Sequence, residues 1–225
     1  MIVVHNAWQS AYPGAALGLL VMEGVANPDS HPALAHRKEA LETELRIRYS
    51  GKSREDISAL PILQAYALYY RRFKKTYHVQ LQLESLVFKG RSIPSVAALV
   101  EAMFMAELKN LLLTAGHDLD TLDLPVTLNV SAGGELYTVL RGHKQVMKPD
   151  DMFIADRQGI ISSVIYGPDR RTQITRATRR VLFTVYAPPG VGAPTVRQHL
   201  EDIYENVLLI SPYAQTERLE VHCAS

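Results

Sequence analysis

The sequence predicts an α+β fold, in which helices pack against a mostly antiparallel mixed sheet. Residues 32–113 carry apolar side chains at the spacing of amphipathic helices, whereas residues 126–186 contain short β-rich runs separated by turn residues. A final helical pattern starts at Pro194. Helices followed by a block of strands indicate this class rather than a doubly wound parallel sheet, in which strands and helices alternate.

The chain of 225 residues is long enough to bury a substantial core, and we expect a single domain. Within it we distinguish a strand and helical lead-in (1–93), a central part (94–188) and a C-terminal helix and tail (189–225). The 24 Lys and Arg against 23 Asp and Glu create no strong overall field. Contact with RNA would therefore require a local basic patch.

Cysteine use and hydropathy predict a soluble, cytoplasmic protein without membrane contact. Cys223 is the only cysteine, so an intramolecular disulfide is excluded and a reducing compartment is expected. The apolar stretch Ala15–Val25 contains Glu23 and is well short of the roughly 20 residues that a membrane-spanning helix needs.

The N-terminal part predicts two strands and then several helices. Ile2–Val4 and Leu17–Val25 are short apolar runs typical of buried strands, and Ser53–Asp56 resembles a capping box. We expect helices at Pro32–Tyr49, Pro61–Lys75, Gln80–Lys89 and Ser95–Leu113. The last of these has an apolar face wide enough to predict that the helix is largely buried.

The helix predicted at Pro61–Lys75 ends in a cluster of cations. The cluster consists of Arg71, Arg72, Lys74 and Lys75. One interpretation is a solvated helix end whose cations complement the negative pole of the helix. The other is a patch that contacts phosphates, with Tyr69, Tyr77 and His78 nearby to stack on bases, and it predicts tRNA or another RNA as partner.

The second half of the chain predicts a mostly antiparallel sheet of at least five strands. The β-rich runs are Val126–Val130, Leu136–Leu140, Met152–Asp156, Ile160–Tyr166 and Val181–Tyr186. Glycine-containing and Pro-Asp turn signals separate them. Pro188–Gly190 then interrupts the chain before the C-terminal helix, which we expect to end near Leu209.

Two polar stretches, Thr114–Asp120 and Tyr166–Thr175, lie between apolar segments, and we expect both to be loops that carry a site. The second contains Asp169, Arg170, Arg171 and Thr172. Its guanidinium groups suit a phosphate or carboxylate, while His117 and Asp118 of the first stretch would be the catalytic pair that activates water. Alternatively, Asp169 pairs with a neighbouring arginine and Asp118 caps a turn.

Several segments in residues 94–188 have the order and spacing of a known module. They are the helix Ser95–Leu113, the segment Ala115–Leu122, the turn Gly133–Glu135, the hairpin Phe153–Ile160, and Thr175 with Thr178 before the strand Val181–Tyr186. In this order they resemble the B3/B4 module of the phenylalanyl-tRNA synthetase β subunit, which hydrolyses misacylated tRNA. The lead-in, with Tyr70–Arg72 and Glu84–Leu86, resembles free-standing versions of that module. The resemblance implies a mixed-sheet α+β fold, a pocket between the two loops and a relation to aminoacyl-tRNA.

The chain departs from this module at its chemical positions. Ala115 occupies the place of the editing histidine, and Thr184 the place of the glutamate that recognises the hydroxyl of the wrong amino acid. A threonine hydroxyl makes a weaker, neutral contact than a carboxylate, so editing of the synthetase type is not expected. The predicted ligand pocket consists of Thr114, Ala115, Gly116, Asp120, Asp169, Arg170, Arg171, Thr172 and Thr184.

The sequence leaves three functions open. The first is a tRNA- or RNA-binding protein related to the editing module. The second is a small-molecule or aminoacyl-ester hydrolase, or a binding protein for a small anionic or aminoacyl ligand, and the third is a protein-interaction domain. No cofactor is predicted. No metal site is predicted either, because His117, Asp118 and Asp120 cannot all point the same way and no further ligands follow at suitable spacing.

Overall fold

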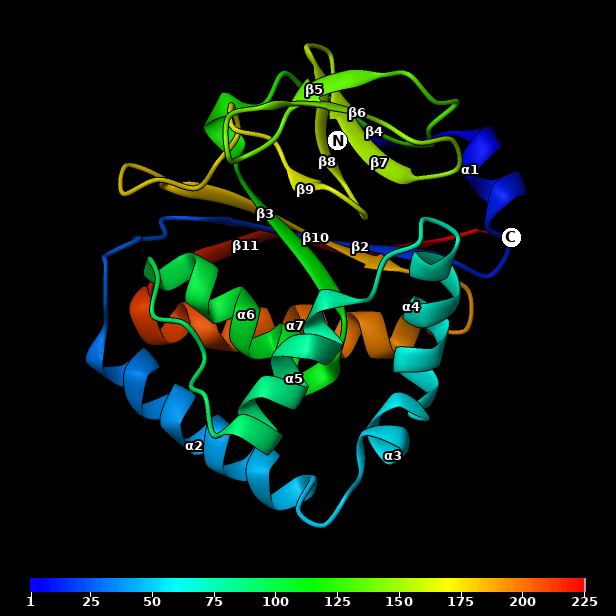
Figure 1. Ribbon diagram of the computed structural model, residues 1–225. Helices are drawn as coiled ribbons and strands as arrows, with labels where there is room; N and C mark the ends of the chain where they lie inside the picture. The colour runs from blue at the N-terminus through cyan, green and yellow to red at the C-terminus, as the bar shows by residue number, and fades with distance from the viewer. Residues whose placement is uncertain (225) are drawn as a thin grey trace.

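The computed structural model describes residues 1–224, which form three layers (Figure 1). All helices except the short first one occupy one side, a four-stranded sheet crosses the middle, and a five-stranded sheet with a small hairpin forms the other side. A continuous cluster of buried hydrophobic side chains, from Trp8 to Ala224, runs through these layers. The predicted α+β fold with mostly antiparallel strands is confirmed.

The middle sheet is antiparallel throughout. Its strand order is β11 (Gln215–Cys223), β2 (Ala16–Glu23), β10 (Arg180–Ala187) and β3 (Leu113–Asp118). Helix α7 (Ala193–Ile210) packs closely on β2 at Gly18, where an added Cβ would lie 2.6 Å from the Val196 side chain. Glycine therefore permits the close approach that buries this strand.

The outer sheet is mixed. Its strand order is β1 (Ile2–Val4), β4 (Val126–Val130), β7 (Met152–Asp156), β8 (Gly159–Ser163) and β9 (Gly167–Pro168). β1 and β4 are parallel, and the other neighbours are antiparallel. The hairpin of β5 (Leu136–Thr138) and β6 (Lys144–Val146) is joined to the stretch after β9 by a bridge between Val139 and Asp169.

The remaining helices precede β3. They are α1 (Asn6–Ala11), α2 (Pro32–Arg48), α3 (Arg54–Ser58), α4 (Pro61–Arg71), α5 (His78–Lys89) and α6 (Ala98–Asn110), and a short 3-10 turn, η1 (Leu119–Thr121), follows it. The predicted capping box of α3 is confirmed, because the Ser53 hydroxyl accepts from the Asp56 N–H at 3.1 Å and the Asp56 carboxylate accepts from the Ser53 N–H at 2.8 Å.

The tyrosines of α4 connect the helical layer to both sheets. The Tyr66 hydroxyl donates to the Tyr186 carbonyl of β10 at 2.5 Å, and the Tyr70 hydroxyl donates to the Val164 carbonyl after β8 at 3.0 Å. Tyr77 stacks on Tyr66 with ring centroids 4.1 Å apart. Tyr69 is 3 % and Tyr77 is 1 % exposed, so the expectation that they stack on bases is wrong.

The stretch Thr114–Asp118, predicted to be a loop, is the edge strand β3. Gly and Asp are uncommon in strands. Here, groups outside the sheet accept hydrogen bonds from the backbone N–H groups on the unpaired edge of β3. The Thr114 N–H donates to a Glu107 carboxylate oxygen at 2.7 Å, and the Asp118 N–H donates to the Thr172 carbonyl at 2.8 Å. The local sequence around β3 does not reveal these partners, because the groups that stabilise the strand lie elsewhere in the chain.

Two further predictions about the sheets need correction. The β-rich runs do not form one sheet, because Val181–Tyr186 pairs with β2 and β3 while the other runs build the outer sheet and the hairpin. The C-terminal tail was not expected to contain a strand, and α1 was not expected either. β11 has mostly exposed or half-buried side chains, so it lacks the apolar alternation that identifies a strand.

Candidate functional site

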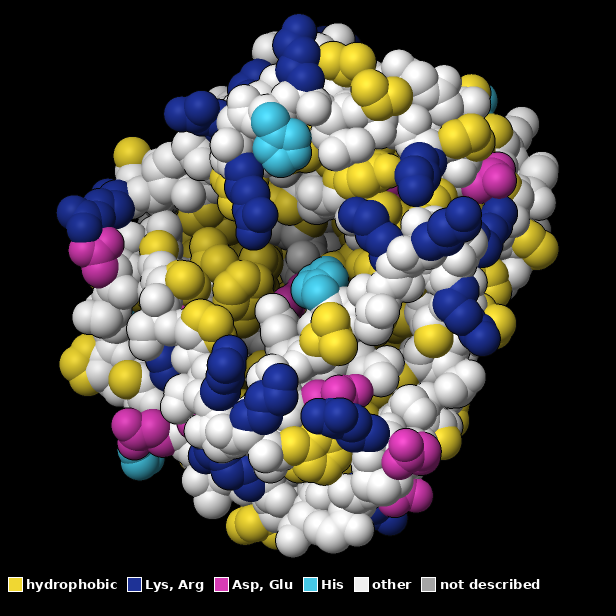
Figure 2. Space-filling model, viewed as in Figure 1, with side chains coloured by type: hydrophobic (Ala, Val, Ile, Leu, Met, Phe, Trp, Pro, Cys, Tyr) yellow, Lys and Arg dark blue, Asp and Glu magenta, His cyan; other side chains and the backbone are white. Residues whose placement is uncertain are grey.

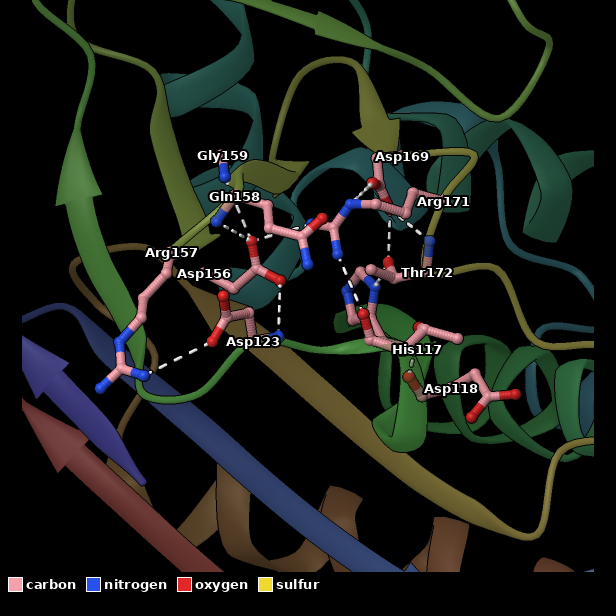
Figure 3. A network of polar contacts seen from close by, with 11 residues as sticks. His117, Asp118, Asp123, Asp156, Arg157, Gln158, Gly159, Asp169, Arg171 and Thr172 are labelled. Carbon is pink, nitrogen blue, oxygen red and sulfur yellow. Dashed lines mark hydrogen bonds and ion pairs between the residues drawn. The ribbon is translucent and has the colours of Figure 1, made fainter.

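The two polar stretches lie side by side, and His117, Asp169 and Arg171 join a network of polar contacts between them (Figure 3). His117 is 0 % exposed, and its Nδ1 lies 2.7 Å from the Thr172 hydroxyl oxygen. Because that hydroxyl donates to Asp169, its oxygen accepts from the His117 Nδ1–H, which leaves Nε2 unprotonated. Burial and the nearby Arg171 lower the pKa of His117 to about 3, so the ring is neutral.

The two arginines of the second stretch point apart. Arg171 pairs with Asp156 at 2.8 Å and donates to the Thr121 carbonyl at 3.0 Å, which ties η1 to the β7–β8 turn (Figure 3). Arg170 is exposed and lies against the β5–β6 turn, where an added Cβ on Gly142 would be 2.9 Å from its Nη1. The pair therefore does not form a joint clamp for one anion.

Asp118 and its neighbours have structural partners. One Asp118 oxygen accepts from the Thr178 hydroxyl at 2.7 Å, and the other accepts from the Asp120 N–H at 3.2 Å, which caps η1. Asp120 is exposed and pairs with Arg180 at 3.1 Å. Gly116 is packed tightly, since an added Cβ would lie 2.7 Å from Ile174. The catalytic assignment of His117 and Asp118 stays a prediction, and the contacts seen here are those of the structural alternative.

A cavity of about 210 Å³ opens beside this network. Leu113–Ala115 of β3 form one wall, Ser163–Pro168 form the opposite wall, and His78 and Tyr186 complete the lining. Parts of both predicted stretches therefore meet at a hollow, namely Thr114 and Ala115 from the first and the segment 166–168 from the second. Their charged residues lie in the neighbouring network instead.

Ala115 and Thr184 are direct partners on adjacent strands. Ala115 lines the cavity, and the Thr184 hydroxyl, 0 % exposed, donates to the Ala115 carbonyl at 3.4 Å. The other polar groups here are also hydroxyls: Ser162 bonds to Tyr186, and Tyr137 donates to the Gly167 carbonyl at 2.8 Å. This wall is neutral and offers no carboxylate at either position.

The cations at the end of α4 take different roles. Lys75 stands at the rim of the cavity, with Nζ 4.5 Å from the Tyr166 ring centroid and 3.4 Å from the Ile165 carbonyl oxygen. Burial and the nearby Lys148 lower its pKa. Arg72 is held away by Asp150 at 3.3 Å and by the Tyr12 ring, whereas Arg71 and Lys74 are exposed.

A second hollow adjoins the first. It measures about 340 Å³, lies between α5 and α6 and shares His78 with the first cavity. Its lining is mostly apolar and includes Leu81, Leu86 and Phe104. Figure 2 shows this face hollowed at its centre, with hydrophobic side chains on one wall and Lys and Arg around the rim.

One buried polar residue near the first cavity was not predicted from the sequence, namely Glu107 of α6, which accepts from the Thr114 N–H. It is 1 % exposed, and one of its carboxylate oxygens has no hydrogen-bond partner. The sequence contained one signal that could have indicated this residue, namely a glutamate within a helix predicted to be largely buried. Glu101 carries the same signal but pairs with Lys38 at 2.8 Å.

Residues 1–224 contain neither a cluster suited to a metal ion nor a helix suited to crossing a membrane. In this part of the chain, no group of three His, Cys, Asp or Glu side chains is arranged to hold a metal ion. None of its helices combines the length and the apolar character required to cross a bilayer. Cys223 is exposed and unpaired.

The chain is similar in structure to an N-terminal fragment of the phenylalanyl-tRNA synthetase β subunit from Pyrococcus horikoshii. The TM-score is 0.50 and the sequence identity is 10 %, over 97 % of this chain and 54 % of that fragment. The protein thus spans about half the length of its structural neighbour. At this identity the likeness supports a distant resemblance of fold, as the sequence motifs implied. No protein-family model and no curated protein matches the sequence.

Proposed function

We propose that the protein binds the aminoacylated 3′ end of tRNA or of a similar RNA in the cavity between β3 and the β8–β9 bend. The observation that carries this proposal is a small cavity with Lys75 at its rim. At about 210 Å³ the cavity is smaller than the roughly 300 to 1,000 Å³ typical of pockets for drug-sized ligands. It suits one terminal group, and the adjoining hollow beside His78 provides room for the terminal nucleotide.

The charge distribution around the cavity supports an RNA end as ligand. Lys75 is at the rim, and Arg71 and Lys74 extend the positive surface along the end of α4. Single-stranded RNA ends are recognised by cations that follow the phosphates and by flat side chains on which bases stack. His78, which lines both hollows, is such a side chain.

The proposal is binding without hydrolysis of the synthetase type. The fold is distantly similar to that of the synthetase fragment, and three of the segments that resemble its editing module contribute Leu113, Ala115 and Tyr186 to the cavity lining. Ala115 and Thr184 supply neither an imidazole nor a carboxylate at the positions where that module has them. The pocket can therefore receive an aminoacyl group without the side chains that remove it.

Titration of bulk tRNA at increasing salt tests this proposal. The logarithm of the association constant should fall linearly with the logarithm of the salt concentration, and Lys75→Gln should reduce the slope by roughly 0.7 to 1. Arg197→Gln is the control, because Arg197 is exposed on α7 and lines neither hollow. Aminoacylated tRNA should bind more tightly than deacylated tRNA. A flat salt response, or no binding at low ionic strength, would remove the proposal.

The second candidate function is hydrolysis or binding of a small aminoacyl or anionic ligand. It is favoured by the fact that both predicted stretches contribute to the cavity wall. Incubation with a panel of mischarged tRNAs separates the two functions. Deacylation that is lost in His117→Ala and Arg170→Ala would establish the hydrolase, whereas binding without deacylation agrees with the first proposal.

A further inference from the structure

Glu107 is a buried carboxylate with an unmet oxygen, and it lies directly behind Thr114, which lines the proposed binding cavity. Its Oε1 accepts from the Thr114 N–H at 2.7 Å, and Thr114 lines the cavity. Oε2 has no hydrogen-bond partner, although the residue is only 1 % exposed to solvent.

No cation in residues 1–224 neutralises this carboxylate. None of the ion pairs formed within that range includes Glu107, whereas Glu101, which precedes it on α6, pairs with Lys38. The titratable groups nearest to it are Tyr66 and Tyr70 of α4 and Tyr77 before α5, and burial raises the pKa of all three. His78, on the same side, has a pKa lowered by burial. The surroundings of Glu107 are therefore neutral.

We propose that Glu107 is the recognition group for a primary ammonium on the ligand, and that this ammonium is the α-amino group of an aminoacyl moiety in the cavity. An ammonium supplies the donor that Oε2 lacks and the positive charge that a buried carboxylate requires. The inference rests on the proposed function and specifies which part of the ligand the cavity reads. Asp151, a second buried carboxylate with an unmet oxygen, already accepts from the Tyr69 hydroxyl at 2.7 Å and has the cation Lys75 nearby, whereas Glu107 has no such cation.

The protonation of Glu107 gives this proposal a distinctive signature. Burial raises the pKa of Glu107 to about 8, and the hydrogen bond from Thr114 offsets this only in part. At pH 7 the carboxyl group of the unliganded protein is therefore mostly protonated. A bound ammonium favours the ionised form, so binding should release a proton from Glu107.

Calorimetric titration of leucinamide and phenylalaninamide, each beside its N-acetylated form, tests the proposal without RNA. The wild-type protein should bind the free amines at least about tenfold more tightly than the acetylated forms, since a charge-assisted hydrogen bond is lost on acetylation. In Glu107→Gln this preference should disappear. Glu101→Gln, a buried glutamate of the same helix outside the cavity, should retain it.

Proton release provides a measurement that needs no variant. Titrations at pH 7 in two buffers of different ionisation enthalpy should show up to one proton released with the free amines and none with the acetylated forms. Equal binding of both forms to the wild-type protein, or no binding of the amines at millimolar concentration, would overturn the inference. So would an amine preference that survives in Glu107→Gln. The tRNA salt titration tests the RNA-binding proposal independently, so failure of that proposal can be distinguished from failure of the inference about Glu107.

Discussion

Strand β3 carries two polar regions only a few residues apart, and they differ in whether they border an open cavity. At His117 and Asp118, the partners are the fixed side chains Thr172 and Thr178, and the histidine is fully enclosed, so that its unpartnered Nε2 faces no solvent. At Thr114 and Ala115, the strand borders an open cavity, and the nearby Glu107 has an unmet oxygen. The comparison indicates that the most reactive side chains hold β3 to its neighbours, while plainer residues of the same strand line the cavity that we propose as the binding surface.

Among substitutions that test whether the polar network stabilises the fold, we expect the largest loss of stability at Asp156. Its carboxylate pairs with Arg171 and accepts the N–H groups of Asp123, Gln158 and Gly159. Asp156→Ala should lower the free energy of unfolding by about 3 kcal/mol, because a charge and several donors lose their partner. Urea denaturation measures this. A loss below about 1 kcal/mol would show that the network contributes little to stability.

The pH dependence of stability should come in part from the buried histidines. His117 and His199 have a pKa of about 3 in the folded protein, whereas an unfolded histidine has its ordinary pKa near 6.5. Below that ordinary value the unfolded chain binds protons that the folded chain does not, so stability falls with acidification by up to about 1.4 kcal/mol per pH unit for each histidine.

His117→Gln should remove one of these contributions. Urea unfolding of the wild-type protein and the variant between pH 7 and pH 5 should therefore give curves of stability that converge as the pH falls. Parallel curves would mean that His117 is not held neutral in the folded protein.

Thr172→Val should have a smaller effect of about 1 to 2 kcal/mol on the free energy of unfolding. The valine keeps the shape of the side chain but leaves the His117 Nδ1–H and the Asp169 carboxylate without their shared hydroxyl. Thermal unfolding of the variant checks this. A neutral result would indicate that His117 finds another partner.

Much of the fold was predictable from local patterns. The helix Pro32–Tyr49, the Ser53 cap and the hairpin Phe153–Ile160 depend on nearby residues, and each lies close to its expected position. The division of the strands into two sheets depends on pairings such as β10 with β2, which lie far apart in the sequence. Local periodicity contains no information about such pairings.

The site was predictable only in outline. The proximity of the two polar stretches was expected, and the structure brings them together through the Asp118 N–H to Thr172 carbonyl bond. The sequence did not predict which side chains face a cavity, because successive side chains of a strand point to opposite faces of the sheet. On β3, Ala115 faces the outer sheet, while Thr114 bonds to His199 of α7. With Thr114–Asp118 taken as a loop, no such alternation could be assigned.

The central claim, that the ligand-binding surface is the cavity and not the histidine network, is tested most directly by comparing two variants in one assay. Ala115→Leu fills the cavity, while Thr172→Val weakens the network beside it. In titrations with aminoacylated tRNA at low salt, Ala115→Leu should weaken binding at least about tenfold, a loss of about 1.4 kcal/mol. Thr172→Val should lose stability and bind like the wild-type protein. The reverse pattern, with binding lost in Thr172→Val and unchanged in Ala115→Leu, would contradict the account.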